Sequence, residues 1–504
     1  MVIAATLWVT GCATLPPLEG RPETHVVAHT ADTRLGRSIT PRAAEHPGQS
    51  GIYALAVPTD AFAARVVLAA TAEKTLDVQY YIWRGDQTGY LLFEALWRAA
   101  GRGVRVRLLL DDNNTKGLDE TIAALDAHPN IEVRLYNPVA SRSGRMLQML
   151  GDFSRLNRRM HNKSFTADDQ ATIVGGRNVG NEYFGAGEET LFTDLDVLAI
   201  GKAVHEVSAA FDLYWNSASA YPASLLLEPA GDGASGRLLE RFAQTRDDPE
   251  SKSYIDAVRD TPLVQELLDG KLAMEWADAR AVRDDPAKTL DPQAGGDTLM
   301  LTGLLATFGN AANTFDLVSP YFVPGKDGAA ALVALASRGV ATRVLTNSLA
   351  ATDVGAVHAG YSKSREELLR GGVRLYELKP TATTQQTKKK GQGSSPESLH
   401  AKTFAVDRKR IFVGSFNFDP RSARLNTEMG LVIESPALAS RLAATLDQGL
   451  AQNAYELRLS PGGSIEWIER VGTSEIVHED EPRTGALRRA WIRFLSWLPI
   501  DWLL

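Results

Sequence analysis

The chain has 504 residues, of which 44% are hydrophobic and 23% are charged, a composition typical of a globular protein with two or three compact cores. This composition excludes an intrinsically disordered chain and a collagen-like repeat. The chain carries 54 Lys and Arg against 61 Asp and Glu, which gives a formal net charge of −7. There is therefore no overall basic field to attract nucleic acid, and no nucleic-acid partner is expected.

The single cysteine, Cys12, follows a short apolar run at residues 2–11. About 20 helical residues are needed to cross a ~30 Å hydrocarbon layer, so this run is too short for a transmembrane helix. The pattern resembles a bacterial lipobox, in which a cysteine after an apolar segment receives a diacylglycerol. We predict a signal or lipobox segment at 1–12, a tether at 13–50, and a membrane-associated protein of the bacterial cell envelope that is lipid-anchored at Cys12. The alternative is a buried cysteine in a docked N-terminal segment.

Most of the remaining chain repeats itself with a period of about 239 residues. Three strand-like runs recur in the same order in both halves, at 76–83, 104–110 and 133–136, and again at 315–323, 340–346 and 373–376. Helical patterns lie between them, at 90–100, 118–127, 329–337 and 358–369. Strands that alternate with helices of this length favour a sheet covered on both faces. We predict two similar α/β/α lobes related by internal duplication, at 51–225 and 297–455, with the active site at the lobe interface.

Three segments fall outside this repeat. Residues 226–296 have no counterpart and contain an amphipathic stretch at 263–281, so we predict a helical connector that wraps one lobe. Residues 381–398 are rich in Gly, Ser, Gln and Lys and are expected to form a mobile loop. Residues 456–504 form a C-terminal extension.

Each half carries the same set of chemically active residue types. A His-x-Lys pair is followed by an Asp after four intervening residues and then by Gly-Gly-x-Asn or Gly-Ser-x-Asn, at His161, Lys163, Asp168, Gly175, Gly176 and Asn178, and again at His400, Lys402, Asp407, Gly414, Ser415 and Asn417. The two histidines are 239 residues apart, in register with the strands. One such motif would be only suggestive, but two copies at the repeat period are strong evidence for a duplicated site.

The spacing has a physical interpretation. Side chains two residues apart on a strand point to the same face, so the imidazole and the ammonium of each motif converge on one pocket. The glycines allow a close approach of the backbone to a ligand, and an Asn adds an amide donor. We therefore predict that the residues after each hairpin, Gly176, Asn178, Ser415 and Asn417, bind a substrate phosphate.

Two histidines on either side of a phosphate suggest a mechanism. One attacks phosphorus as a nucleophile, and the other protonates the leaving oxygen and then deprotonates the incoming alcohol or water. The lysines and asparagines would stabilise the negative charge, so neither a metal nor another cofactor is expected. Each imidazole also needs an acceptor on its far nitrogen, and Asp194 and Glu428, at matching positions in the two halves, are the candidates. Asp168 and Asp407 complete the motif and are expected to hold the hairpin after each strand rather than to touch substrate.

These motifs resemble those of the phospholipase D superfamily, over nearly all of residues 50–455. The resemblance implies a two-lobed fold, one active site between the lobes and a covalent phosphohistidine, with His161 as nucleophile and His400 as acid and base. The stretches at 76–83, 107–115, 152–165, 175–184 and 415–430 are most similar to bacterial C-type cardiolipin synthases. This branch implies a phosphatidyltransferase that makes cardiolipin from phosphatidylglycerol, with phosphatidylethanolamine as a further phosphatidyl donor. The main type carries two N-terminal transmembrane helices, which this sequence does not show, so we expect another mode of membrane attachment.

Two further segments indicate contact with a membrane surface. Residues 142–159 mix arginines with apolar side chains ahead of His161, and residues 487–504 combine arginines with tryptophans, as an interfacial anchor does. The alternatives are a helix packed on its own lobe and a tail docked in a groove. The lysines at 388–390 are a weaker candidate for lipid contact. His358, which starts a predicted helix after Asp353, is a candidate to reach the mouth of the site, although a structural role is the more ordinary interpretation.

Other functions remain open from the sequence alone. A phospholipase D that releases phosphatidic acid would use the same residues, because only the acceptor differs. A phosphodiesterase acting on nucleic acid and a non-catalytic envelope protein are the remaining alternatives, and the net charge and the two complete motifs count against them. We expect a monomer whose partners are phospholipid substrates and the membrane surface.

Overall fold

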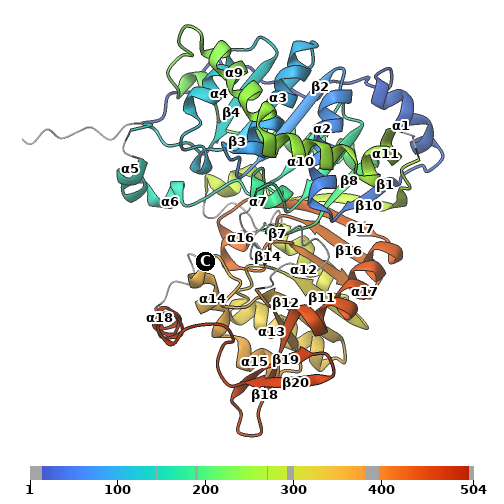
Figure 1. Ribbon diagram of the computed structural model, residues 1–504, viewed down its shortest axis with the longest axis vertical. Coiled ribbons are helices and arrows are strands. Elements are labelled where there is room, and N and C mark those ends of the chain that lie inside the picture. The colour runs from blue at the N-terminus through green and yellow to red at the C-terminus, as the bar shows by residue number, and fades with distance from the viewer. Residues whose placement is uncertain are drawn as a thin grey trace, which may run out of the picture.

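The two halves of the chain form two lobes that lie one against the other, blue to green and yellow to red in Figure 1. The computed structural model describes residues 14–143, 145–187, 191–268, 271–291, 300–380 and 397–498. Cys12, the lysines at 388–390 and most of the predicted mobile loop lie outside these residues.

The sheets of the two lobes have the same strand order and direction. In the first lobe the order is β9 (Ala220–Pro222), β4 (Ile131–Tyr136), β3 (Arg105–Asp111), β2 (Thr75–Tyr80), β5 (Ser164–Ala167), β6 (Ala171–Gly175), β8 (Asp196–Gly201) and β1 (Ser50–Leu55). In the second it is β18 (Ala454–Leu459), β13 (Arg374–Leu378), β12 (Ala341–Asn347), β11 (Thr314–Val318), β15 (Thr403–Val406), β16 (Arg410–Gly414), β17 (Met429–Glu434) and β10 (Glu275–Arg283). In each lobe the three strands predicted from the repeat are parallel neighbours. The predicted duplication of an α/β lobe is confirmed.

Strand β10 joins the two sheets, because it pairs with β17 through residues 278–283 and with β1 through residues 275–277. The amphipathic helix expected at 263–281 is therefore wrong. Residues Pro262–Leu268 form the short helix α11, and the chain then becomes a strand. In that strand Ala277 and Ala279 are buried while Asp278 and Arg280 are exposed, a period of two that the helical interpretation overlooked.

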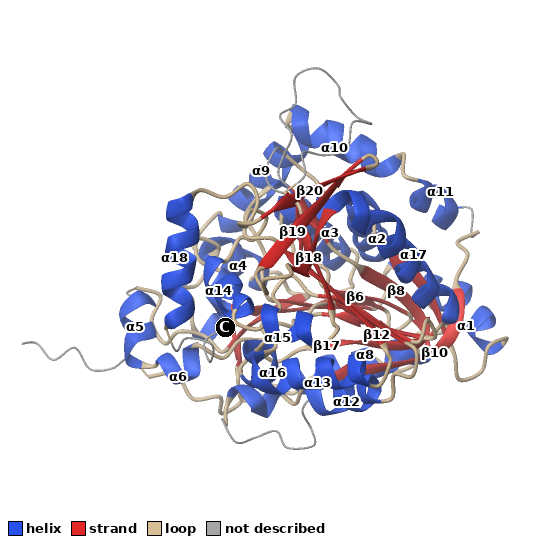
Figure 2. Ribbon diagram, turned by 90° about the horizontal axis from the view of Figure 1, so that it is seen from below, coloured by secondary structure: helices blue, strands red, loops and turns tan. Residues whose placement is uncertain are grey.

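Helices cover the sheets, and Figure 2 shows the strands in the middle with helices outside them. The first lobe has α2 (Pro58–Thr71), α3 (Gln87–Gly101), α4 (Asp119–Asp126) and α8 (Lys202–Trp215), and the connector adds α9 (Ala234–Asp247) and α10 (Pro249–Arg259). Helices α9, α10 and α11 pack on α2, α3 and α4, so the connector covers the first lobe. The second lobe has α12 (Met300–Gly309), α13 (Gly325–Ser337), α14 (Gly355–Ser362), α15 (Arg365–Arg370) and α17 (Pro436–Asn453). The helix expected at 358–369 is thus two helices, α14 and α15.

A shared apolar core fixes the two lobes to each other. Strands β6 and β8 of the first lobe lie against β16 and β17 of the second. Val174 and Val197 are buried there in one cluster with Val413 and Leu431. Burying such a face removes apolar area from water, so the lobes meet in a fixed orientation and the residues at their boundary are held in place.

The segments at either end are docked on the lobes. In the segment expected to be a tether, the Arg21 guanidinium donates to the carbonyls of Asn216, Ser217 and Ala220, and residues Arg34–Ala44 form helix α1. The second lobe extends past the expected boundary at 455, because β18, β19 (Ile465–Val471) and β20 (Ser474–His478) continue its sheet. The last element of the described residues is helix α18 (Ala486–Trp497). Within the described residues, no helix combines the length and the apolar character that a membrane crossing demands.

Candidate active site at the lobe interface

The backbone at each histidine is held by the opposite lobe. His161 follows helix α6 (Phe153–Leu156), and its amide donates to the carbonyl of Thr427 at 2.9 Å. The amide of His400 donates to the carbonyl of Thr193 at 2.8 Å, where β14 (Glu397–Leu399) lies parallel to β7 (Leu191–Thr193). Figure 1 shows β7 and β14 at the boundary between the lobes. The two histidines are therefore brought to one place by the packing of the lobes.

Each imidazole is paired with an acidic side chain of the opposite lobe. Nδ1 of His161 lies 2.8 Å from Oε2 of Glu428, and Nδ1 of His400 lies 2.5 Å from Oδ2 of Asp194. All four side chains are buried. Each candidate acid therefore orients the histidine of the other lobe. A partner at Nδ1 fixes the ring and its tautomer, and directs Nε2 toward the substrate.

The two lysines lie beside these rings. Nζ of Lys163 donates to the carbonyl of His161, and Nζ of Lys402 lies 2.9 and 3.1 Å from the ring nitrogens of His400. Both lysines are buried, and burial lowers the pKa of Lys163 to about 7 and that of Lys402 to about 8. The ammonium and the histidine of each motif lie close together, but the two His-x-Lys pairs precede β5 and β15, so the expected placement on a strand is wrong.

The electrostatics favour neutral histidines. Burial, reinforced by the lysine charges, lowers the pKa of His400 to about 4 and that of His161 well below its ordinary value. Burial also raises the pKa of Glu428 to about 7. For Asp194 burial is the largest single effect and raises the pKa, but the charge and hydrogen bond of His400, together with Lys402, outweigh it and lower the pKa overall. The two His–acid pairs therefore differ, because Asp194, beside His400, is more firmly ionised than Glu428, beside His161.

Asp168 and Asp407 hold backbone rather than substrate groups. The carboxylate of Asp168 accepts hydrogen bonds from the amides at 73–75, and that of Asp407 accepts them from the amides at 312–314. Both residues have a positive φ, of 51° and 54°. In each lobe the Asp thus pins the hairpin after the His-x-Lys segment to the first strand of the parallel set.

Gly176 and Ser415 contact the acids in this structure, which differs from the phosphate contact expected of them. A Cβ on Gly176 would lie 2.2 Å from Oδ1 of Asp194, so the glycine makes room for that carboxylate. At the equivalent position the hydroxyl of Ser415 donates to Oε2 of Glu428. The reason is that the turn after each hairpin faces the acid that enters from the following strand region.

The two asparagines are not equivalent. Asn178 accepts a hydrogen bond from the amide of Ile82 at 3.1 Å and donates to the hydroxyl of Tyr183 at 3.0 Å, so both ends of its amide bind protein groups. Asn417 is also buried, but within the described residues its Oδ1 has no hydrogen-bond partner. Asn417 is therefore the better placed of the two to orient toward a ligand.

Aromatic rings surround the histidines, and the motifs did not reveal them. The ring of Tyr81 lies edge-on to His161 with 4.9 Å between centroids, while Tyr183 and Phe192 lie 5.2 and 5.1 Å from His400. One signal was available in the sequence, because Tyr81 recurs as Tyr321 at the repeat period.

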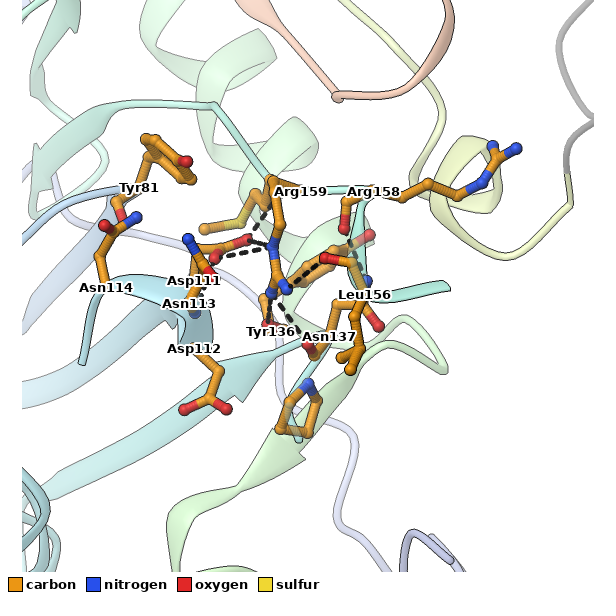
Figure 3. A network of polar contacts seen from close by, with 12 residues as sticks. Tyr81, Asp111, Asp112, Asn113, Asn114, Tyr136, Asn137, Leu156, Arg158 and Arg159 are labelled. Carbon is orange, nitrogen blue, oxygen red and sulfur yellow. Dashed lines mark hydrogen bonds and ion pairs between the residues drawn. The ribbon is translucent and has the colours of Figure 1, made fainter. Parts of the chain in front are cut away.

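A buried polar network positions the segment that leads into His161 (Figure 3). The carboxylate of Asp111, at the end of β3, accepts from Nε of Arg159 at 3.0 Å and from the amide of Met160 at 2.9 Å. Arg159 also donates to the carbonyl of Asn137 at 2.8 Å. In the second lobe Asn347, at the end of β12, makes two hydrogen bonds of 3.0 Å with the backbone of Leu399, the residue before His400. The residue ahead of each histidine is thus fixed by the end of the equivalent strand.

Most of the arginines ahead of His161 bind acidic or backbone groups of their own lobe. Arg142 pairs with Asp112 and Asp119, at 2.6 and 2.5 Å, and Arg145 lies near the same two acids. The segment 142–159 contains α5 (Arg145–Gly151) and α6, and these arginine contacts tie it to the first lobe, while its contact with a membrane surface stays a prediction.

His358 does not reach the site. It is buried in α14, where its Nε2 lies 2.8 Å from Glu481 and 2.7 Å from Arg365. It therefore connects the second lobe to the segment ahead of α18. Among the residues that the structure describes, no group of three or more His, Cys, Asp or Glu side chains is arranged to hold a metal ion.

Comparisons with known proteins agree with this architecture. The family model described as "Cardiolipin synthase, PLD-like domain" matches residues 67–215 and 304–450, one segment in each lobe. Cardiolipin synthase C of Escherichia coli is 49% identical over 474 residues, which cover 94% of this chain and all of that protein. The major cardiolipin synthase of Bacillus subtilis is 25% identical over 75% of this chain and 64% of its own length. A crystal structure of phosphatidylserine synthase from Haemophilus influenzae has the same fold, with a TM-score of 0.57 at 13% identity, over 94% of this chain and all of that one.

Proposed function

Because the chain belongs to the cardiolipin synthase family with a phospholipase D-like domain, we propose that it is a phosphatidyltransferase that makes cardiolipin through a covalent phosphohistidine. Its substrates are phosphatidylglycerol and, as a further phosphatidyl donor, phosphatidylethanolamine. The observation that carries the mechanism is that each histidine is oriented by an acid of the opposite lobe. Two oriented, neutral imidazoles therefore lie beside two ammonium groups.

In the first step Nε2 of His161 attacks the phosphorus of the donor lipid. A P–N bond forms, the P–O bond to the headgroup breaks, and His400 gives a proton to the leaving oxygen. Lys163, Lys402 and Asn417 stabilise the charge on the remaining phosphoryl oxygens. An anionic phosphate raises the pKa of nearby imidazoles. When the substrate binds, His400 therefore takes up a proton from solvent, and this is the proton that it gives to the leaving oxygen.

In the second step His400 removes the proton from a hydroxyl of phosphatidylglycerol. The alcohol oxygen attacks phosphorus, the P–N bond to His161 breaks, and cardiolipin leaves. The assignment of roles rests on the two acids: His400 pairs with the more firmly ionised Asp194, which suits the residue that must carry a proton. His161 pairs with Glu428 and remains the neutral nucleophile.

Water in place of the second alcohol would make the protein a phospholipase D. Incubating the purified full chain with phosphatidylglycerol, with and without phosphatidylethanolamine, and separating the lipids distinguishes the two reactions. We expect cardiolipin in both mixtures and free ethanolamine in the second. Phosphatidic acid as the sole product would overturn the proposed transfer to an alcohol. The matched controls are His161→Asn and His400→Asn.

We also propose that helix α18 binds the membrane surface. It packs on α14 through the buried Ile492 and leaves Leu487, Trp491 and Trp497 exposed, at 89%, 57% and 80% of their surfaces. Its exposed Arg493 complements anionic headgroups. A docked face with an unburied aromatic face on the same helix is typical of an interfacial helix.

Vesicle sedimentation tests this contact. Changing Trp491 and Trp497 to Ala should weaken binding to phosphatidylglycerol vesicles by about tenfold or more, while the same change at two exposed leucines, Leu225 of the first lobe and Leu239 of the connector helix α9, should not. Equal binding by both double variants would exclude α18 as the contact.

The remaining attachment is proposed at Cys12, which we infer to carry a diacylglycerol. Mass spectrometry of the membrane fraction tests it, since an unmodified Cys12 on a retained N-terminus would contradict it. We propose that the protein acts as a monomer, because one chain supplies both histidines and both acids.

A further inference from the structure

In the first lobe the ring of Tyr81 covers His161, and the second lobe has a tyrosine, Tyr321, at the equivalent position. Tyr321 follows β11 as Tyr81 follows β2, at the repeat period. Its carbonyl accepts a hydrogen bond of 2.8 Å from the hydroxyl of Ser319, which also accepts from the amide of Phe418 at 3.0 Å. The amide of Val323 donates to the carbonyl of Phe418 at 2.8 Å. This loop is therefore fixed beside the turn that carries Asn417.

Tyr321 differs from Tyr81 in its partner. The ring of Tyr81 packs against the imidazole of His161, whereas the hydroxyl of Tyr321 donates to Oδ2 of Asp353 at 2.8 Å. Asp353 is exposed, in the loop between β12 and α14. The duplicated site thus has a carboxylate on its His400 side, at a position where the symmetry of the motifs would not place one.

This carboxylate lies close enough to Lys402 to act on its charge. After Asp194 and Glu428, the charge of Asp353 raises the pKa of Lys402, against the larger lowering caused by burial. The loop is also fixed from outside, because Arg488 of α18 donates to the carbonyl of Thr352 at 3.5 Å. The loop that carries Asp353 therefore connects the reaction centre to the helix proposed to bind the membrane.

A carboxylate beside a phosphodiester site determines which chemical groups can bind next to the phosphate. It repels the phosphate itself, and it accepts hydrogen bonds from hydroxyl or ammonium groups. The headgroups of phosphatidylglycerol and phosphatidylethanolamine both carry such a donor a few bonds from the reacting phosphorus. A methyl headgroup carries none.

We propose that Asp353, oriented by Tyr321, binds the hydrogen-bond-donating end of the lipid headgroup on the His400 side of the phosphate. This inference rests on the proposed function. The leaving alcohol and the incoming alcohol both exchange a proton with His400, so they occupy the same side of phosphorus in turn. One subsite then holds the ethanolamine or glycerol that leaves and the glycerol of the acceptor that enters.

The test measures the first half-reaction, which needs no acceptor. Headgroup release in the first turnover is followed by rapid quench, with phosphatidylethanolamine, phosphatidylglycerol or phosphatidylmethanol as the donor in otherwise identical detergent micelles. We expect Asp353→Asn to slow release from the first two lipids by about tenfold, the factor typical of one hydrogen bond to a charged group. Release of methanol from the third should change by less than about twofold.

Tyr321→Phe should show the same pattern with a smaller loss, because the carboxylate remains but its orientation is lost. Glu479→Gln, at an exposed carboxylate on the C-terminal extension, is the matched control and should leave all three rates unchanged. A loss confined to phosphatidylethanolamine supports a subsite for an ammonium, and a loss with both donors supports one for hydrogen-bond donors in general.

An equal loss with all three lipids, or no loss with any, would overturn the subsite. Failure of the proposed function looks different in the unmodified protein. A phospholipase D would release headgroup but form no cardiolipin, and a protein without phosphatidyl transfer would release no headgroup from any lipid. A thermal melt of each variant checks its folding, and the exposed position of Asp353 leads us to expect no change.

Discussion

The carboxylate of Asp194, in the first lobe, lies 2.5 Å from Nδ1 of His400, in the second. Glu428 makes the reciprocal contact to His161 at 2.8 Å. Neither lobe therefore contains a complete site, and the packing of the lobes is itself a condition for catalysis.

Loss of the Asp194 charge should affect chemistry more than folding. Asp194→Asn leaves the shape of the side chain but removes the charge that orients and stabilises the His400 imidazolium. We expect kcat to fall by about 10⁴, the loss seen when the acid of a catalytic triad is made neutral. Glu428→Gln should cost about 10-fold to 100-fold, because the pKa of Glu428 is already raised to about 7 and the residue is partly protonated at neutral pH. Equal losses in the two variants would contradict the proposed difference between the acids.

Gly176 provides a steric test of the same contact. Gly176→Ala places a Cβ 2.2 Å from Oδ1 of Asp194 and should displace that carboxylate, so kcat should fall nearly as far as in Asp194→Asn. The control is Gly236→Ala in α9, where a Cβ meets no atom within 4 Å. The steady-state rates of the two variants test whether the Asp194 carboxylate is needed in its place. An active Gly176→Ala enzyme would argue against a role for Asp194.

The two hairpin aspartates should affect stability. Asp168 is buried and accepts from three backbone amides, so Asp168→Ala leaves those donors without their acceptor. We expect the free energy of unfolding to fall by about 2–4 kcal/mol in a urea titration. The exposed Asp327 should tolerate Asn with a change below about 0.5 kcal/mol. A fully stable Asp168→Ala protein with no activity would instead indicate a direct catalytic role.

Binding of a tetrahedral dianion should take up protons. Lys163 and Lys402 have pKa values of about 7 and about 8, so at pH 8 both are partly neutral. Sulfate stabilises the ammonium forms, which raises both pKa values and draws protons from the buffer. Calorimetry at pH 8 in two buffers of different ionisation enthalpy should show an uptake of about one proton, and the affinity should fall as the pH rises from 7 to 9. Identical heats in the two buffers would contradict this charge state.

The sequence could predict those features of the fold and of the site that repeat along the chain at a fixed period. The 239-residue repeat located the duplicated lobes, the parallel strands and both His-x-Lys pairs. The alternation of a strand did not place the pairs, because His161 and Lys163 lie just ahead of β5. It also singled out Asp194 and Glu428 as the acids.

Spacing within one half could not show which lobe each acid serves, because the exchange between lobes arises only when the two sheets pack through their shared core. The same limit explains Ser415, whose hydroxyl faces Glu428 rather than a ligand. It also explains β10, whose residues gain their strand partners only from the assembled sheets. The sequence analysis named Asp353 only as the residue before a predicted helix, because the first motif has no counterpart that would assign it a role.

The proposed mechanism requires a phosphatidyl group to be carried covalently on His161. We propose to mix the His400→Asn variant with a phosphatidyl ester of p-nitrophenol, a leaving group that needs no proton, and to quench with denaturant at mildly alkaline pH, which preserves the acyl esters, before peptide mass spectrometry. We predict release of one equivalent of nitrophenol and an acid-labile phosphatidyl adduct on His161, with neither in His161→Asn. An adduct on His400 of the unmodified protein, or rapid turnover without any adduct, would contradict the mechanism.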